Sequence, residues 1–263
     1  MLPQWCNLIR ANNPGPMTLD GTNTYVLATG AGNIVIDPGP LIEEHLAAVI
    51  ELGPVAFTVL THHHPDHSES AARFHELTGA PVLAQDPALC IAGETLTRDD
   101  SALDVPDLDL RVLHTPGHTA DSICIEVRGP ATGNTGPESA PGRDWHGLLT
   151  GDTVLGRGTT VVAHPDGRLG DYLSSLERLR SRLDDGWTLL PAHGPVRADA
   201  ATVVTEYLAH RQARLNEVRA ALAAGATTPR EVVEIVYADV DRSVWPAAER
   251  TVAAALDYLD ERI

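Results

Sequence analysis

The chain has 263 residues and a formal net charge of −17, and all 19 of its basic residues are arginine. A chain of this length can bury one sizeable core, and it fits a domain of roughly 200 residues with a small appendage. No apolar stretch approaches the roughly 18 residues that a membrane span needs, and the acidity disfavours a nucleic-acid-binding surface.

The N-terminal and cysteine patterns indicate a cytoplasmic protein. Residues 1–17 contain no basic stretch that leads into an apolar run, so no export signal is predicted. Cys6, Cys90 and Cys124 are odd in number and lack paired spacing. We therefore expect reduced, mostly structural thiols in a reducing compartment.

Strands and helices alternate in the first part of the chain. Residues 24–28 and 33–36 are typical of a hairpin around a glycine-containing turn. Residues 43–52 show the helical spacing of apolar side chains, and an apolar strand follows at residues 55–60. Ser68 is placed to cap the helix that comes next. This alternation predicts an α/β sandwich.

A dense group of metal-binding side chains directly follows that apolar strand. Residues 61–67 read Thr-His-His-His-Pro-Asp-His. In an extended segment, residues two apart point the same way, so His62 and His64 can bind one ion. The proline turns the chain, so that Asp66 and His67 can face a second ion. Imidazole nitrogens with a carboxylate suit zinc or another borderline first-row metal.

Three further candidate ligands lie far downstream, each next to an apolar run. They are His118, Asp152 and His193, and small or turn-forming residues flank each of them. With the four upstream side chains they give seven candidates. One site would comprise His62, His64 and His118, and a second would comprise Asp66, His67 and His193, with the carboxylate of Asp152 bridging both.

Several stretches of the sequence resemble the metallo-β-lactamase superfamily and, within it, the lactamase-beta-2-like branch. These stretches are Asp20-Gly21-Thr22-Asn23-Thr24-Tyr25, Ile36-Asp37-Pro38-Gly39, Thr115-Pro116-Gly117-His118-Thr119, Gly151-Asp152-Thr153-Val154-Leu155-Gly156, Gly158-Thr159-Thr160 and Tyr207-Leu208-Ala209-His210-Arg211. The resemblance covers nearly the whole chain and implies an αββα metallo-β-lactamase sandwich, which we assign to residues 1–199. It also implies a small helical, winged-helix-like C-terminal domain, which we assign to residues 200–263.

The C-terminal region is predicted to be helical. Residues 200–224 show apolar spacing with interleaved arginines, Thr228 begins a capping box, and residues 243–259 form a last helix. In related proteins such a tail often ends in a β-hairpin wing, and here we expect that wing to be short or missing. The simpler role for the tail is packing, or contact in a homodimer, rather than nucleic-acid binding.

One segment departs from the alternation of strands and helices. Residues 129–146 are rich in Gly, Pro, Ser, Thr and Asn, and they are predicted to form a long loop. His118 precedes one flanking strand and Asp152 follows the other, so in a hairpin both ligands lie opposite the loop. We therefore expect a distal loop rather than a lid, with His146 as a surface histidine.

The resemblance implies a dinuclear hydrolase. Two adjacent cations, Zn²⁺ or alternatively Mn²⁺ or Fe, would lower the pKa of a bridging water and stabilise a developing oxyanion. Asp66 would orient the resulting hydroxide as well as bind metal, and Asp37 would either support the site or cap a turn. His210 is a candidate for the substrate cleft, without an assigned role. Candidates for a general acid, by residue type only, are His63, His114 and His164.

The substrate is the least determined property. We favour a small or acyl-carrier-bound ester or thioester, as in glyoxalase-II-like and acyl-carrier thioesterase relatives, because an acidic surface does not impede such a substrate. The alternative is a single-stranded RNA endonuclease, as in the lactamase-beta-2-like branch, but the basic cluster at residues 178–182 precedes two aspartates. A β-lactam is disfavoured without an export signal. A metal-stabilised scaffold without enzymatic activity is the remaining alternative.

Overall fold

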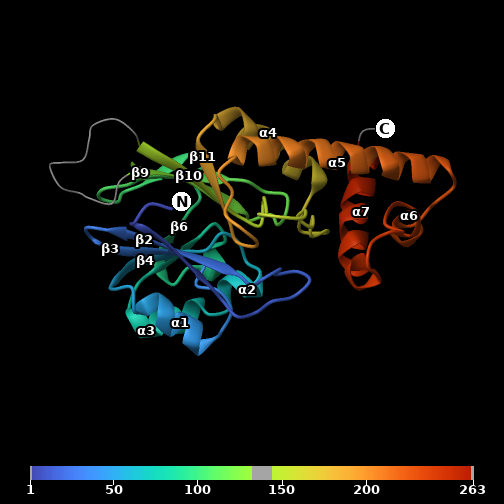
Figure 1. Cartoon of the computed structure of the whole chain (residues 1–263). Helices are drawn as coiled ribbons and strands as arrows, with labels where there is room; N and C mark the ends of the chain where they lie inside the picture. The colour runs from blue at the N-terminus through green and yellow to red at the C-terminus, as the bar shows by residue number, and fades with distance from the viewer. Residues whose placement is uncertain (1, 132–143, 262–263) are drawn as a thin grey trace.

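Two mixed β-sheets stacked face to face form the centre of the computed structural model (Figure 1), which describes residues 2–131 and 144–261. The first sheet has six strands in the order β1 (Cys6–Arg10), β2 (Asn23–Thr29), β3 (Gly32–Ile36), β4 (Val55–Val59), β5 (Val82–Ala84) and β6 (Ala92–Thr95). The second sheet has five strands in the order β11 (Trp187–Pro191), β10 (Asp144–Gly151), β9 (Ile123–Pro130), β8 (Asp109–His114) and β7 (Ser101–Leu103).

Helices cover the outer faces of both sheets, which confirms the predicted αββα sandwich. The helices of the described residues are α1 (Glu43–Ile50), α2 (Pro65–Ser68), α3 (Ala71–Thr78), α4 (Leu169–Arg182), α5 (Ala200–Ala223), α6 (Pro229–Val236) and α7 (Trp245–Asp260), with 3₁₀ turns η1 (Pro87–Leu89) and η2 (Arg242–Val244). In Figure 1, α1 and α3 lie outside the first sheet, and α4 lies outside the second. Within the described ranges, no helix is long and apolar enough to cross a membrane.

The alternation of side chains along β2 and β3 supplies two different hydrophobic cores. Tyr25 and Leu27 belong to the core between the sheets, whereas Val26 packs with the helices outside the first sheet. On β3, Ile34 and Val35 divide in the same way. Successive residues of a strand point to opposite faces, so a strand that is apolar at every position is covered on both sides. The predicted hairpin is confirmed, since β2 and β3 pair antiparallel.

The outer face of the second sheet and the C-terminal helices share one hydrophobic cluster. Leu148 of β10 and Leu189 of β11 lie in it with Leu176 of α4, Val204 of α5 and Val252 of α7. The hydrophobic effect therefore fastens the helical tail directly to the sandwich. The division into domains after residue 199 stays a prediction, although α5 begins at that boundary.

The helical tail follows the predicted pattern closely. Thr228 and Glu231 form the predicted capping box at the start of α6, each side chain bonding the backbone N–H of the other residue. The last helix begins at Trp245 rather than two residues earlier, because the 3₁₀ turn η2 precedes it. Between residues 200 and 261 the structure contains helices and turns but no strand.

Ser68 does not cap the helix that follows it, contrary to the prediction. It lies in α2, and its Oγ donates to the carbonyl oxygens of His63 and His64 at 2.8 and 3.0 Å. Pro65 stands in the first turn of α2, where its fixed φ favours an early helix start. The next helix, α3, begins only at Ala71.

The strands β9 and β10 form the predicted antiparallel hairpin, and their ligand-bearing ends lie opposite the intervening segment. Both strands reach further into the predicted loop at residues 129–146 than the composition suggested. The central part of that loop, residues 132–143, lies outside the described residues.

His146 is a half-buried strand residue, which corrects the prediction of a surface histidine in a loop. It pairs with residues of both neighbouring strands, and its ring centroid lies 5.0 Å from that of Trp187. Its position six residues before Asp152 on β10 puts it roughly 20 Å from that carboxylate, given the rise of a strand. The expectation that His146 lies far from the candidate metal site is therefore confirmed.

Burial protects two of the three cysteine thiols, none of which is in a disulfide. Burial raises the pKa of the Cys6 thiol to about 12 and that of the Cys124 thiol to about 11. Because the thiolate is the reactive form, we expect only the half-buried Cys90 to react readily with a disulfide reagent at pH 8. Thiol counting in native, unfolded and Cys90→Ser protein checks this. Three rapidly reacting thiols in the native protein would contradict it.

Candidate metal centre

The seven candidate ligands meet at one edge of the sandwich, where several strands end. β10 and β11 run parallel, so Asp152 and His193, which follow them, emerge side by side. His118 lies in the loop between β8 and β9, and the segment after β4 supplies the remaining four. Possible ligand atoms lie within 4.8 Å of one another in three overlapping groups, which are His62–His64–His118, His62–His67–Asp152 and Asp66–His67–His193.

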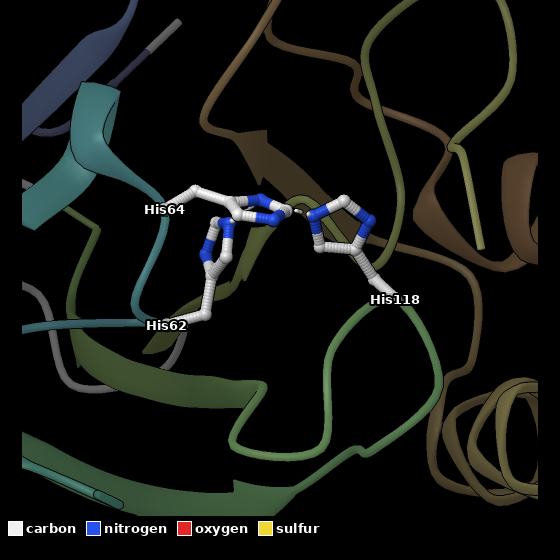
Figure 2. Close-up of side chains that lie close together, drawn as sticks. All are labelled: His62, His64 and His118. Carbon is white, nitrogen blue, oxygen red and sulfur yellow. Dashed lines mark hydrogen bonds between the residues drawn. The ribbon is translucent and has the colours of Figure 1, made fainter. Parts of the chain in front are cut away.

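The first group consists of three histidines whose rings point toward one another (Figure 2). His64 Nδ1 lies 3.0 Å from His62 Nε2 and 3.0 Å from His118 Nε2. Three imidazole nitrogens around one tetrahedral zinc ion would be about 3.3 Å apart, given zinc–nitrogen bonds of about 2.0–2.1 Å. The arrangement thus needs only small shifts to hold a metal ion.

The second group combines histidines with carboxylates. Asp66 Oδ2 lies 3.1 Å from His193 Nε2 and 3.4 Å from His67 Nε2. Asp152 stands between the two groups. Its Oδ1 lies 3.3 Å from His193 Nε2, and its Oδ2 lies 3.7 Å from Nε2 of His118 in the first group. Its two oxygens are therefore directed to different sets of nitrogens, as a bridging ligand requires.

The histidines of the first group are neutral. Burial lowers the pKa of His62 well below its usual value, and the neighbouring His67 lowers it further. Burial likewise lowers the pKa of His64 to about 4, and it lowers the pKa of His118. A neutral imidazole keeps a lone pair on one nitrogen, and this is the form that binds a metal ion.

The second group titrates in the opposite direction. Burial, the largest single influence, would lower the pKa of His67 and His193, but the facing carboxylates together outweigh it, with Asp152 the strongest of them. The pKa of His67 therefore lies well above its usual value, and the pKa of His193 rises to about 9. Burial would raise the pKa of Asp66 and Asp152, but the facing histidines hold both below the usual value. Two ionised carboxylates therefore face this site, and a divalent cation can take over the role of the two ring protons.

Unpartnered atoms at the centre of the cluster support the fit to a cation. His67 Nε2, His193 Nε2 and Asp152 Oδ1 are buried without a hydrogen-bond partner in the structure. Buried polar atoms in proteins are almost always satisfied, because an unsatisfied one costs about 1–3 kcal/mol. Asp152 Oδ1 lies 3.6 Å from His67 Nε2 and 3.3 Å from His193 Nε2. One bound ion could therefore satisfy all three atoms.

Asp37 orients two of these histidines from behind. It is 2% exposed and stands at φ 52°, a conformation that is uncommon outside glycine. Its Oδ2 accepts hydrogen bonds from His67 Nδ1 at 2.8 Å and from Thr61 Oγ1 at 2.7 Å. Thr61 Oγ1 in turn lies 3.1 Å from His62 Nδ1. The hydrogen of the Thr61 hydroxyl is donated to Asp37, so in the contact with His62 the Nδ1–H of His62 is the donor. The lone pair on His62 Nε2 is therefore free.

A loop at residues 158–163 positions His118 and Asp152. The carbonyl oxygen of Val161 accepts from His118 Nδ1 at 2.6 Å, and Thr160 Oγ1 donates to the Asp152 carbonyl oxygen at 2.7 Å. Arg211 of α5 donates to the Thr160 carbonyl oxygen. The helical tail is thereby connected to the ligands by two successive hydrogen bonds.

The candidates for a general acid by residue type do not join the cluster. His63 Nδ1 bonds Asp121 at 2.8 Å, and with Asp166 these two form a separate, more exposed group. His114 Nε2 donates to a backbone carbonyl oxygen, and His164 Nε2 lies 2.7 Å from the Asp257 carboxylate. The His63 ring centroid lies 4.9 Å from that of His64, but none of the three histidines belongs to the ligand groups, so the general acid stays unassigned.

A cavity of about 370 Å³ extends from the ligand cluster to the helical tail. Its lining includes His118 and Asp152 of the ligand cluster as well as Tyr237 and Val240 of the tail. His210 also lines the cavity, which supports its candidacy for the substrate cleft. The cavity is walled mainly by apolar surface.

Sequence reasoning missed most of this cavity. Met17 and Leu19 from the N-terminal loop form part of its wall, as do Val244 and Ala248 near the C-terminus. An exposed methionine in a turn-rich segment was the one available signal, and Met17 is indeed 52% exposed. The contact between both ends of the chain depends on tertiary packing, which residue spacing does not reveal.

Two protein families match the sequence. Residues 17–130 match the metallo-beta-lactamase superfamily, and residues 228–262 match the beta-lactamase associated winged helix domain. Asp152 and His193 lie between the two matched ranges.

Known proteins resemble the chain over most of its length. It is 30% identical over 264 residues to a beta-lactamase-like protein 2 homolog of Caenorhabditis elegans. This alignment covers 95% of this chain and 82% of that protein. It is 32% identical over 255 residues to an atrochrysone carboxyl ACP thioesterase of Aspergillus chevalieri. This alignment covers 90% of this chain and 74% of that protein. A metallo-beta-lactamase family protein of Thermus thermophilus shares the fold, with a TM-score of 0.76 and 24% identity across 98% of this chain and 94% of that one.

Gly117, next to His118, tests how tightly this loop must pack. It has φ +139°, and a Cβ there would lie 2.3 Å from Tyr172 Cα. We expect Gly117→Ala to cost about 1–3 kcal/mol more than Gly186→Ala, because overpacking adds to the strain of positive φ. Gly186 is the control, since it has φ +112° and open space around its Cβ position. Urea unfolding measures both, and equal losses of stability would refute the packing argument.

Proposed function

The chain belongs to the metallo-β-lactamase superfamily and is a hydrolase of that family, and we propose that it uses two metal ions to hydrolyse carrier-bound or small esters and thioesters. The observation that carries this proposal is the apolar cavity of about 370 Å³, one end of which lies at the ligand cluster. A cavity of this size and lining suits an acyl group.

We assign the metal ligands according to the observed groups. His62, His64 and His118 hold one ion, and Asp66, His67 and His193 hold the other, with Asp152 between them. Bound divalent cations supply Lewis acidity and a hydroxide nucleophile near neutral pH. Zinc is the first choice for this set of imidazoles and carboxylates, and iron and manganese are the alternatives.

Asp66 is the proposed catalytic residue. Its side chain is 27% exposed, whereas His67 and His193 beside it are fully buried. Asp66 can therefore contact both a metal ion and the attacking nucleophile, from which it accepts a hydrogen bond. In the reaction, oxygen from water adds to the acyl carbon, the bond from that carbon to sulfur or oxygen breaks, and a proton passes to the leaving group.

The relative from Aspergillus chevalieri supports an acyl-carrier substrate, since it is named as an ACP thioesterase. The cavity provides independent support. A thioester carbonyl at the metals would place the acyl group against the tail residues, where Tyr237, Val240 and Val244 contribute an apolar wall.

The basic cluster at residues 178–182 weighs against RNA as the substrate. Arg178 forms an ion pair with Asp99 at 2.8 Å, and Arg182 pairs with Glu126 at 2.6 Å. These guanidinium groups are already neutralised by carboxylates, so they provide little attraction for a phosphate backbone.

Metal content tests the ligand assignment. We expect wild-type protein to bind about two divalent ions per chain and His64→Gln to bind about one, because a three-histidine site loses a ligand. The adjacent His63 bonds Asp121 instead of facing the cluster, so His63→Gln should keep both ions. Elemental analysis of dialysed protein measures the content. An equal loss in both variants would refute the assignment.

Hydrolysis of acyl thioesters tests the reaction. We expect metal-loaded protein to hydrolyse acyl groups from N-acetylcysteamine or a carrier protein, and Asp66→Ala to lower kcat by at least about 100-fold. The exposed Glu69 bonds only the Leu41 backbone, so Glu69→Gln serves as the control and should retain activity. End-labelled single-stranded RNA is assayed in parallel. Cleavage of RNA but not of thioesters, with the same dependence on Asp66, would favour the nuclease instead.

A further inference from the structure

Arg211 occupies an unusual position on α5. It falls in the apolar stripe formed by Val204, Tyr207, Leu215 and Val218, and like them it is buried, with 4% exposure. A charged side chain in such a stripe is expensive to bury unless a partner compensates the charge.

The partners of Arg211 within the protein leave its charge uncompensated. It donates to the carbonyl oxygen of Thr160, and its guanidinium lies 4.9 Å from the ring centroid of Tyr172. Its Nε is buried without a hydrogen-bond partner. Across residues 2–131 and 144–261, no carboxylate is paired with it, so the fixed partners are a carbonyl dipole and an aromatic ring.

Arg211 differs in this respect from the other arginines of the cavity. Arg157 at the rim is paired with Asp20 at 2.7 Å, and Arg214 is paired with Glu217 at 2.8 Å. The acidic residue in the cavity lining is Asp152, and its carboxylate lies in the ligand cluster rather than paired with Arg211. The part of the cavity at Arg211 thus carries a positive charge that no carboxylate of the described residues pairs, although the whole chain carries a net charge of −17.

His210 adds a second donor beside Arg211. It lines the same cavity, and its Nδ1 is buried without a partner. A guanidinium and an imidazole N–H that line the same cavity can both donate hydrogen bonds to a carboxylate.

We propose that Arg211, assisted by His210, forms a subsite for a carboxylate carried by the acyl group of the substrate. The inference rests on the proposed function and specifies its substrates as esters or thioesters of dicarboxylic acids. The phosphate of a carrier arm is the less suitable occupant, because a long flexible arm separates it from the thioester, whereas Arg211 lies inside the cavity.

Matched substrates test the subsite. Glutaryl and pentanoyl thioesters of N-acetylcysteamine have the same chain length and differ in the terminal carboxylate. We expect wild-type protein to prefer the glutaryl thioester in kcat/KM by about 10- to 100-fold, as the strength of a charged hydrogen bond implies. Arg211→Gln should abolish this preference, mainly through KM, so that the ratio of kcat/KM for the glutaryl thioester to kcat/KM for the pentanoyl thioester falls to about 1 within the variant itself.

Two control variants separate charge recognition from the structural bond to Thr160. Arg214→Gln removes a cavity arginine that is already ion-paired, and it should keep the preference for glutaryl. Arg211→Lys retains the charge and should keep part of the preference, even if Arg211→Gln folds poorly. Metal content and melting temperature are measured for each variant. No preference in wild-type protein, or an equal preference in folded Arg211→Gln, overturns the proposal.

Binding of free glutarate distinguishes failure of the subsite from failure of the proposed function. Titration calorimetry should detect glutarate binding to metal-loaded wild-type protein, with the affinity for glutarate reduced at least 10-fold in Arg211→Gln. The affinity for pentanamide, a neutral compound with the same number of carbon atoms, should be the same in both proteins. If neither thioester is hydrolysed but glutarate binds in this way, the proposed reaction is wrong and the subsite stands. Binding of inorganic phosphate in preference to glutarate, with the same dependence on Arg211, would reject the acyl carboxylate as its occupant.

Discussion

The Asp37 carboxylate is the interaction on which the candidate metal centre depends most. It joins the end of β3 to the segment after β4, because it accepts from the Thr61 backbone N–H at 2.7 Å as well as from His67. The strained backbone at Asp37 is maintained by these bonds, which are made by a side chain 2% exposed. Without that carboxylate, the Nδ1 atom of His67 and the hydroxyl of Thr61 would lose their acceptor, and the ring orientations of His67 and His62 would no longer be fixed from behind.

The two halves of the cluster illustrate how burial and charge produce opposite states from one residue type. In the first half, histidines surrounded by histidines are kept neutral, whereas in the second half histidines facing carboxylates are kept protonated. Burial acts on both halves, so the difference arises from the carboxylates that face the second half, with Asp152 the strongest and Asp37 and Asp66 adding to it. A cation bound there would replace the ring protons of the second half and leave the hydrogen bond from His67 to Asp37 unchanged.

Local patterns predicted the sandwich and the meeting of the candidate ligands, and tertiary packing determined what they missed. His62 and His64 are close in sequence, and Asp152 and His193 follow strands, so spacing and topology were enough. Ser68 was misjudged because the short helix α2 absorbs it. Arg211 belongs to the motif Tyr207-Leu208-Ala209-His210-Arg211 that contributed to the resemblance, but only the structure reveals that its charge lies in an apolar stripe without a carboxylate.

The loop at residues 158–163 has a thermodynamic consequence. It bonds His118 through Val161 on one side, and on the other side Val162 N donates to Thr251 of α7 at 3.2 Å. Thr251 also lines the cavity. If a ligand bound in the cavity orders this loop and so raises the affinity of the protein for metal, thermodynamic linkage requires that bound metal raise the affinity for that ligand by the same factor. The last helix, α7, begins 52 residues after His193 in the sequence, and yet it is bonded to the loop that positions His118.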